Sequence, residues 1–224
     1  MATPAGRHRV RFRGQIAGVG TTSGTRIVVG RWDDTPLGSF ADAMVERPDG
    51  HRLLLASHPD VARLVAATYE FDEIRVERFG VLVGPHGWQV RSDSLELDVA
   101  VGGVTVLGRL LSVVPDRVAT ATWWCALTDV VARTVLTGVR TRGEIGERRE
   151  WYGATAHHRI ESASGTFDGE TLGTLAPVDP PPRFGFSSTP PRPSVTDVVT
   201  TIELDRSVAL VGPSTYAACS RARE

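Results

Sequence analysis

The sequence predicts a single α+β domain that is mainly antiparallel β, with a curled sheet or incomplete β-barrel and two or three helices. Segments that alternate apolar and polar residues, such as 73–79 and 95–101, recur along the 224-residue chain, as half-buried strands do. Turn signals separate several of these segments, including Pro48-Asp49-Gly50 and the pair Asp168-Gly169. Helical spacing of apolar residues is confined to a few places, so the sheet should dominate the fold.

The clearest helix start lies near residue 59. Pro59 and Asp60 suit the first turn of a short helix near 59–68, with Ser57 as the candidate N-cap. A longer helix is expected near 122–136, where apolar residues recur every three or four positions. Residues 104–114 are apolar enough for either a helix or a buried strand, and the pattern does not decide between them.

Composition limits the classes of protein that the chain can belong to. Hydrophobic residues at 41% and charged residues at 23% are ordinary for a globular protein. With no repeat and no internal linker, residues 1–224 read as one domain, in which 1–6 and 214–224 are flexible ends. A net charge of −1 argues against nucleic acid as a partner. No signal peptide and no apolar run of about 18 residues is visible, so we expect a cytoplasmic protein with no membrane partner. A homo-oligomer is compatible with the sequence.

Several catalytic chemistries are excluded or disfavoured by residue type. All 25 basic residues apart from histidine are arginine, so the chain has no lysine for a Schiff base, a P-loop or a pyridoxal phosphate anchor. The two cysteines, Cys125 and Cys219, cannot build a disulfide framework. No spacing typical of a metal site and no G-x-S-x-G nucleophile motif occurs. We therefore expect no cofactor and no metal.

The stretch Arg148–Gly169 holds the densest set of groups able to do chemistry. It is expected to form two extended segments that are broken near Gly153. Alternation with period two places His158 and Ile160 on one face of the strand, which we expect to be packed. The opposite face begins with His157 and carries charged residues, so it should face solvent.

A binding cavity is expected where this stretch meets other parts of the chain. The aromatic residues of the first segment would lie near His158 if the two segments pair, and residues 73 and 75 would oppose them if the barrel closes. The proline-rich stretch 177–193 is expected to be a long loop that two phenylalanines pin at the cavity rim or on the surface. No catalytic residue is assigned, and the candidate ligand-binding residues are His158, Trp151, Tyr152, Glu150, Arg149, Glu73, Arg75, Phe184 and Phe186. The plain alternative is that His158 is a core histidine and the charges are solvated.

The segment Asp34–Asp42, D-T-P-L-G-S-F-A-D, resembles a segment of acetoacetate decarboxylase-like proteins in which a Pro-x-Gly-x-aromatic run precedes an acidic residue. The resemblance implies an incomplete β-barrel around an apolar cavity that receives a small carboxylate. Decarboxylases of that family use a lysine, which is absent here, so the resemblance implies the scaffold and not the activity. The combination of R-R-E-W-Y-G (148–153), T-Y-E-F-D-E (68–73) and R-F-G-F-S-S-T-P (183–190) also resembles a bacterial protein family of unassigned function.

Together these observations predict a soluble protein that binds a small, mainly apolar molecule in a β-barrel cavity. A carboxylate or other anionic end of that molecule would be met by arginine. One alternative is a lysine-independent lyase or isomerase that uses His158 with Glu150 or Tyr152 for proton transfer. Another is a protein-interaction module built on the arginine stripe of residues 7–13 and the proline-rich loop.

Overall fold

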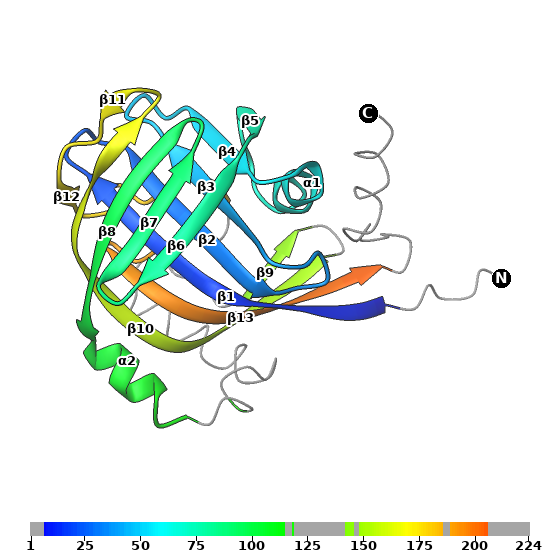
Figure 1. Cartoon of the computed structure of the whole chain (residues 1–224). Coiled ribbons are helices and arrows are strands. Elements are labelled where there is room, and N and C mark those ends of the chain that lie inside the picture. The colour runs from blue at the N-terminus through cyan, green and yellow to red at the C-terminus, as the bar shows by residue number, and fades with distance from the viewer. Residues whose placement is uncertain (1–6, 115–117, 119–141, 146–147, 186–188, 206–224) are drawn as a thin grey trace, which may run out of the picture.

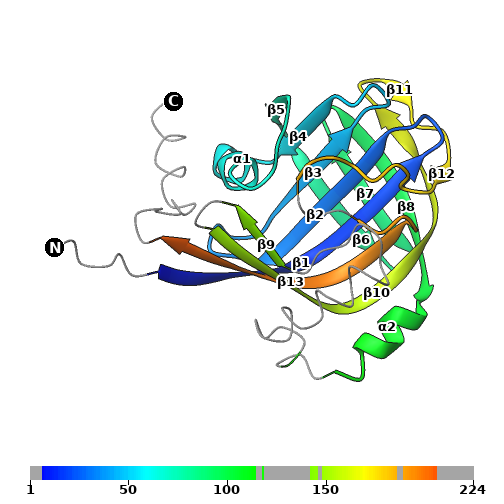
Figure 2. The same cartoon turned by 180° about the vertical axis from the view of Figure 1, so that it is seen from behind.

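A computed structural model describes residues 7–114, 118, 142–145, 148–185 and 189–205 of the chain, and its strands join one curled sheet (Figures 1 and 2). The strand order is β5-β4-β3-β2-β1-β13-β10-β8-β7-β6; β9 and β11 pair with β10, and β12 pairs with β1. All pairs are antiparallel except β4 with β5. The mainly antiparallel, curled half-barrel predicted from the sequence is therefore confirmed.

The first strands are β1 (Arg7–Thr21), β2 (Arg26–Asp34), β3 (Phe40–Glu46), β4 (Arg52–Ala56), β5 (Glu73–Val76), β6 (Phe79–Gly84), β7 (Gly87–Ser92) and β8 (Leu95–Val104). They are followed by β9 (Arg142–Ile145), β10 (Arg148–Phe167), β11 (Glu170–Thr171), β12 (Leu175–Ala176) and β13 (Ser194–Asp205). The helices in the described part of the chain are α1 (Pro59–Ala66) and α2 (Val106–Leu111). Neither of them has the length and apolar character that crossing a bilayer requires.

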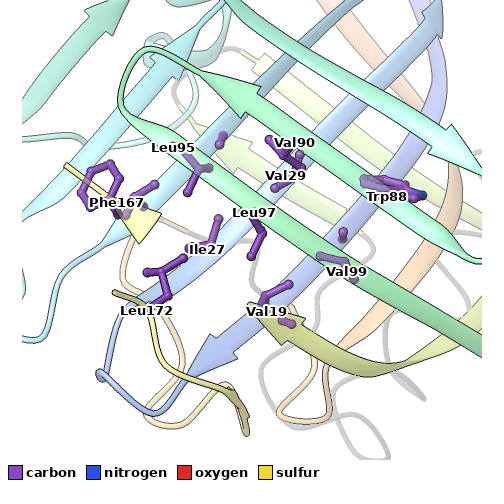
Figure 3. Close-up of a cluster of buried hydrophobic side chains, with 14 of the residues drawn as sticks. Val19, Ile27, Val29, Trp88, Val90, Leu95, Leu97, Val99, Phe167 and Leu172 are labelled. Atoms are coloured by element: carbon purple, nitrogen blue, oxygen red, sulfur yellow. The ribbon is translucent and has the colours of Figure 1, made fainter. Parts of the chain in front are cut away.

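The curl brings strands β6–β8 across β1–β3, so the sheet folds into two facing layers (Figure 1). Hydrophobic side chains from both layers fill the space between them, and Figure 3 shows Ile27 and Val29 of β2 facing Val90 of β7 and Leu97 of β8. These four side chains are fully buried. We call this side of the sheet the inner face. It is a packed hydrophobic core.

The opposite, outer face of β1–β4 is also covered. Helix α1 lies beside β4 and β5 (Figures 1 and 2), and its residues Val61 and Ala62 join Leu54, Phe12 and Ile202 in a second hydrophobic cluster. Residues that point to either face of the sheet are consequently buried along β3 and β4. The central strands therefore lie between two apolar layers.

Several local predictions are confirmed. Gly50 turns the chain between β3 and β4 with a positive φ of 89°, and Asp168-Gly169 turns it between β10 and β11. The short helix starts at Pro59 as expected, but the N-cap assignment is wrong. His58 occupies the N-cap position without a side-chain hydrogen bond, one residue after the predicted Ser57. The longer helix expected at 122–136, both cysteines and the two chain ends fall outside the described residues.

Residues 104–114, which the sequence left undecided, divide between two elements. Strand β8 ends at Val104, and the next residue, Thr105, caps α2 by accepting a hydrogen bond from the Gly108 amide at 3.0 Å. A threonine hydroxyl at this position satisfies one of the amides that the first helical turn leaves unpaired. Thr105 thus marks the point at which the strand ends and the helix begins.

Strand β10 is continuous over 20 residues, so the break expected near Gly153 is wrong. The strand instead changes register against its neighbours at three irregularities, between Ala154 and Ala156, between His158 and Ile160, and between Ile160 and Ser162. Extra residues of this kind bend a strand without ending it. They allow one long strand to follow the curl from β13 to β8.

A buried ion pair ties the proline-rich loop to the sheet. Glu46 at the end of β3 is 1% exposed and accepts hydrogen bonds from Arg26 of β2 at 3.1 Å and from the Arg183 backbone amide at 2.5 Å. Arg26 also donates to the Pro180 carbonyl at 3.0 Å. Removing one member of a buried pair leaves the other charge without compensation.

We predict that Glu46→Leu lowers the free energy of unfolding by about 3–5 kcal/mol, because Arg26 then stays buried without its carboxylate. The double variant Arg26→Met/Glu46→Leu should recover most of this loss, since both charges are gone. Urea unfolding followed by circular dichroism measures both effects. A double variant as unstable as the single one would show that the pair matters through packing rather than charge.

Candidate functional site

A pocket opens on the outer face of the sheet, between the central strands and α1. It has a cavity volume of about 70 Å³, which corresponds to about two water molecules at liquid density or a ligand group of that size. Its walls come from β1, β2, β3, β10 and β13 and from the segment of α1 and the residues after it. The lining residues are Phe12, Ile16, Val28, Gly30, Trp32, Phe40, Asp42, Met44, Leu64, Val65, Thr68, Tyr69, Tyr152, Thr200 and Ile202.

Asp42 is the only carboxyl group among these lining residues. Alternation along β3 places Asp42 on the outer face together with Phe40 and Met44, so the pattern that fills the second cluster also buries this acid. Its side chain is 5% exposed, and its Oδ1 atom accepts a hydrogen bond from the Trp32 indole Nε1 at 3.0 Å. The hydrogen bond spans neighbouring strands and fixes the direction of the carboxyl group.

Gly30 makes room for this arrangement. It lies directly opposite Asp42 in the β2–β3 ladder. A Cβ atom at position 30 would lie 2.6 Å from the Trp32 Nε1 atom and 2.7 Å from the Asp42 Oδ1 atom. These separations are shorter than carbon makes with nitrogen or oxygen in proteins, so the carboxyl and the indole occupy the space that any other residue would fill.

The electrostatic state of Asp42 follows from its burial. Loss of hydration disfavours the charged form and raises the pKa of the Asp42 carboxyl to about 7, while the Trp32 hydrogen bond opposes that shift. The described arginines and histidines do not line the pocket, so no cationic side chain there offsets the burial. Asp42 therefore changes charge close to neutral pH.

Hydroxyl groups supply the remaining polarity of the pocket. Thr200 of β13 is 3% exposed, and its Oγ1 atom has no hydrogen-bond partner in the described part of the chain. The hydroxyl groups of Tyr69 and Tyr152 share a hydrogen bond of 2.7 Å across the pocket wall. A buried hydroxyl without a partner is uncommon in folded proteins and indicates a position where a ligand or a water molecule can bind.

Two of the predicted aromatic residues separate onto opposite faces. Tyr152 lines the pocket, whereas Trp151 lies on the other face of β10, where Arg9 stacks over its ring at 5.5 Å. Arg149 and Glu150 pair in the ladder with Glu203 and Ile202. Their side chains are outside the described set, so their proposed role stays a prediction.

His158 lies on the inner face, as expected, because it pairs with the core residue Val195. The solvent-facing position expected for His157 is wrong: it is 9% exposed, and its Nδ1 atom shares a hydrogen bond of 2.9 Å with Thr105 Oγ1. Helix α2 packs against β10 and covers this face. Burial, and then the charge of His158, lower the pKa of His157. Neither histidine lines the pocket described above.

Glu73 and Arg75 belong to a partly exposed ion network rather than to a cavity wall. Arg75 donates to Glu73 at 2.6 Å and to Asp168 at 2.6 Å, and so connects β5 to the turn after β10. This network thus ties the edge strand β5 to the β10–β11 turn. In the described part of the chain it lies apart from the pocket.

Phe184 is fully buried and packs on Phe71 at 5.9 Å between ring centres, so it pins the proline-rich loop as expected. Phe186 falls outside the described residues. The described residues of this loop do not line the pocket. Around Phe184 the loop is therefore anchored by packing on Phe71.

Sequence reasoning missed the residues at the centre of the pocket: Asp42, Trp32, Thr200 and Tyr69. The signal for Asp42 was present, because one carboxylate stands between Phe40 and Met44 on a single strand face. The pocket position also differs from the prediction, since the inner face holds a packed core and the pocket opens on the outer face.

Comparisons with known proteins found a weak structural match and no match in sequence. No family model matches the chain, and no curated protein matches it. Among solved structures, acetoacetate decarboxylase from Legionella pneumophila matches with a TM-score of 0.39 and 10% identity, over 90% of this chain and 86% of that one. In the described part of the chain, no three histidine, cysteine or acidic side chains gather as a metal site.

We predict that Asp42 makes the stability of the fold depend on pH. The pKa of the Asp42 carboxyl is 3.8 in the unfolded chain and about 7 in the folded protein. Asp42 therefore stabilises the fold most in acid. That contribution is lost as pH rises from about 4 to about 7. The variant Asp42→Asn cannot ionise, and its advantage over the parent protein should grow by about 2–3 kcal/mol between pH 5 and pH 8.

Urea unfolding at the two pH values measures this difference. The matched control is Asp33→Asn on β2, which removes an acid that is 49% exposed and lies outside the pocket. Its stability relative to the parent protein should change little with pH. A constant difference for Asp42→Asn would show that the carboxyl is not desolvated.

Proposed function

We propose that this protein binds a small, mainly apolar molecule in the pocket on the outer face of the sheet. The observation that carries the proposal is Asp42, a buried carboxyl group without an ionic partner among the lining residues of an otherwise apolar pocket. Perturbed acids in open pockets are characteristic of binding and catalytic sites.

The energetic argument starts from the fold itself. Above neutral pH, the buried carboxylate is about 4 kcal/mol less favourable than in the unfolded chain, which is a large fraction of the stability of a domain. An asparagine of the same shape would avoid that term and would still accept the Trp32 hydrogen bond. Because the acid weakens the fold, its presence favours a role in recognition.

The chemistry of the walls supports an apolar body for the ligand. Apart from Asp42 and the hydroxyl groups, the pocket is lined by aromatic and aliphatic side chains. The arginine expected opposite an anionic end is not among the described lining residues, so the proposal no longer includes a carboxylate-bearing ligand. Asp42 and Thr200 instead provide a small polar end within an apolar pocket.

A ligand should be detectable in the purified protein. Native mass spectrometry of the parent protein is expected to show an added small-molecule mass, and Val65→Trp should remove it. Val65 is half-buried on α1 and lines the pocket, so an indole there fills the cavity with little change to the core. The matched control, Arg63→Trp, places the same ring on the exposed side of the same helix and should retain the mass.

Circular dichroism confirms that each variant is folded. A ligand-observed NMR screen of small apolar fragments provides a second readout, because Val65→Trp should abolish fragment binding that Arg63→Trp leaves intact. The proposal fails if the parent protein carries no added mass and binds no fragment. It also fails if both tryptophan variants behave alike.

A further inference from the structure

The charge balance of the pocket indicates what the polar end of a ligand must be. Asp42 is buried with one hydrogen bond, from a neutral indole, and the described cationic side chains lie elsewhere. His58 comes near the wall, edge-on to Phe40 at 6.2 Å between ring centres, but it does not line the cavity. A buried carboxylate needs a positive charge nearby. In this pocket the described protein supplies none.

The walls suit a positive charge for a second, independent reason. Phe12 meets Trp32 edge-on at 6.2 Å between ring centres, and Trp32 meets Phe40 at the same separation. Tyr69 and Tyr152 add two further rings to the lining. Aromatic faces attract cations, and the attraction increases where water is excluded. The acid thus shares its cavity with five aromatic residues, and aromatic walls favour an ammonium group over a neutral end.

Thr200 completes the set. Its buried Oγ1 atom is an acceptor without a partner among the described residues, and Thr200 is one of the residues that line the same cavity. An ammonium group carries several N–H donors, so one can bind the Asp42 carboxylate while another reaches a hydroxyl oxygen. The cavity volume of about 70 Å³ limits the buried part of such a ligand to a few heavy atoms.

We infer that the pocket selects a small organic cation, an amine on an apolar body, whose ammonium group pairs with the Asp42 carboxylate. This inference rests on the proposed function and specifies its ligand class. It also fixes the direction of the pH dependence. An amine binds the ionised form of Asp42, so its affinity rises with pH through about 7. A neutral hydrogen-bond acceptor would bind the protonated acid and show the opposite trend.

The experiment compares three probes of one shape: benzylamine, benzyl alcohol and benzoate. Isothermal titration calorimetry or ligand-observed NMR on the full chain gives their affinities between pH 5.5 and pH 8.5. We expect benzylamine to bind at least about ten-fold more tightly than the alcohol at pH 8. Its affinity should fall about ten-fold between pH 8 and pH 6, as the carboxylate fraction falls. Benzoate should bind most weakly.

Asp42→Asn should remove both the preference for the amine and its pH dependence. Asp33→Asn, which removes an exposed acid from the neighbouring strand, should leave both unchanged and so controls for net charge. If Asp42→Asn does not fold, the pH profile of the parent protein still decides the matter, because its sign differs between the two ligand classes.

Tighter binding of benzyl alcohol or benzoate, or amine affinity that rises as pH falls, overturns the inference and leaves the proposed function in place. Amine binding that survives in Asp42→Asn overturns it equally. If none of the three probes binds at any pH, the inference fails, and the proposed function is then decided by the native mass spectra of the parent protein and Val65→Trp.

Discussion

Burial of the central strands on both faces is the constraint from which the rest of the structure follows. The inner face of β1–β4 packs against β7 and β8, and the outer face packs against α1. A residue that alternation would place in solvent is therefore placed in a second apolar layer. Asp42 is such a residue, and its buried carboxyl is a consequence of where the helix covers the sheet.

The distribution of ion pairs shows how unusual this acid is in its surroundings. On the partly exposed parts of the fold, carboxylates pair with arginine: Arg52 lowers the pKa of Asp72, and Arg78 lowers the pKa of Asp93. Glu46, although buried, is met by two arginines. Asp42 is instead met by the Trp32 indole, and its pKa is raised. Asp42 thus differs from these acids, because no described arginine pairs with it.

Local signals in the sequence predicted local structure well. The hairpin at Gly50, the helix at Pro59 and the turn at Asp168 each depend on residues within a few positions of one another, so their chemistry is readable without the fold. The curled antiparallel sheet also followed from alternation and turn spacing. Alternation along β10 also predicted that His158 faces the inner side of the sheet, because this prediction depends on a single strand.

The pocket was not predictable in the same way. Its walls join residues that are more than a hundred positions apart, such as Asp42 and Thr200, and only strand order brings them together. An interior face is predicted from alternation because apolar residues on one side of a strand contrast with polar residues on the other. Both faces of the central strands are buried, so this contrast is missing there. The burial of His157 was missed for a related reason, because helix α2 covers a face that the strand pattern alone assigns to water.

The close approach of the Trp32 and Asp42 side chains to Gly30 has a consequence for recognising this site in other chains. Since the indole and the carboxyl lie where a Cβ would stand, position 30 accepts a side chain only if the acid or the tryptophan shifts. A protein with the same curled sheet but alanine at the glycine position would have to move its acid aside. The triplet read across two paired strands is therefore a signature of the pocket, whereas the scaffold alone is not.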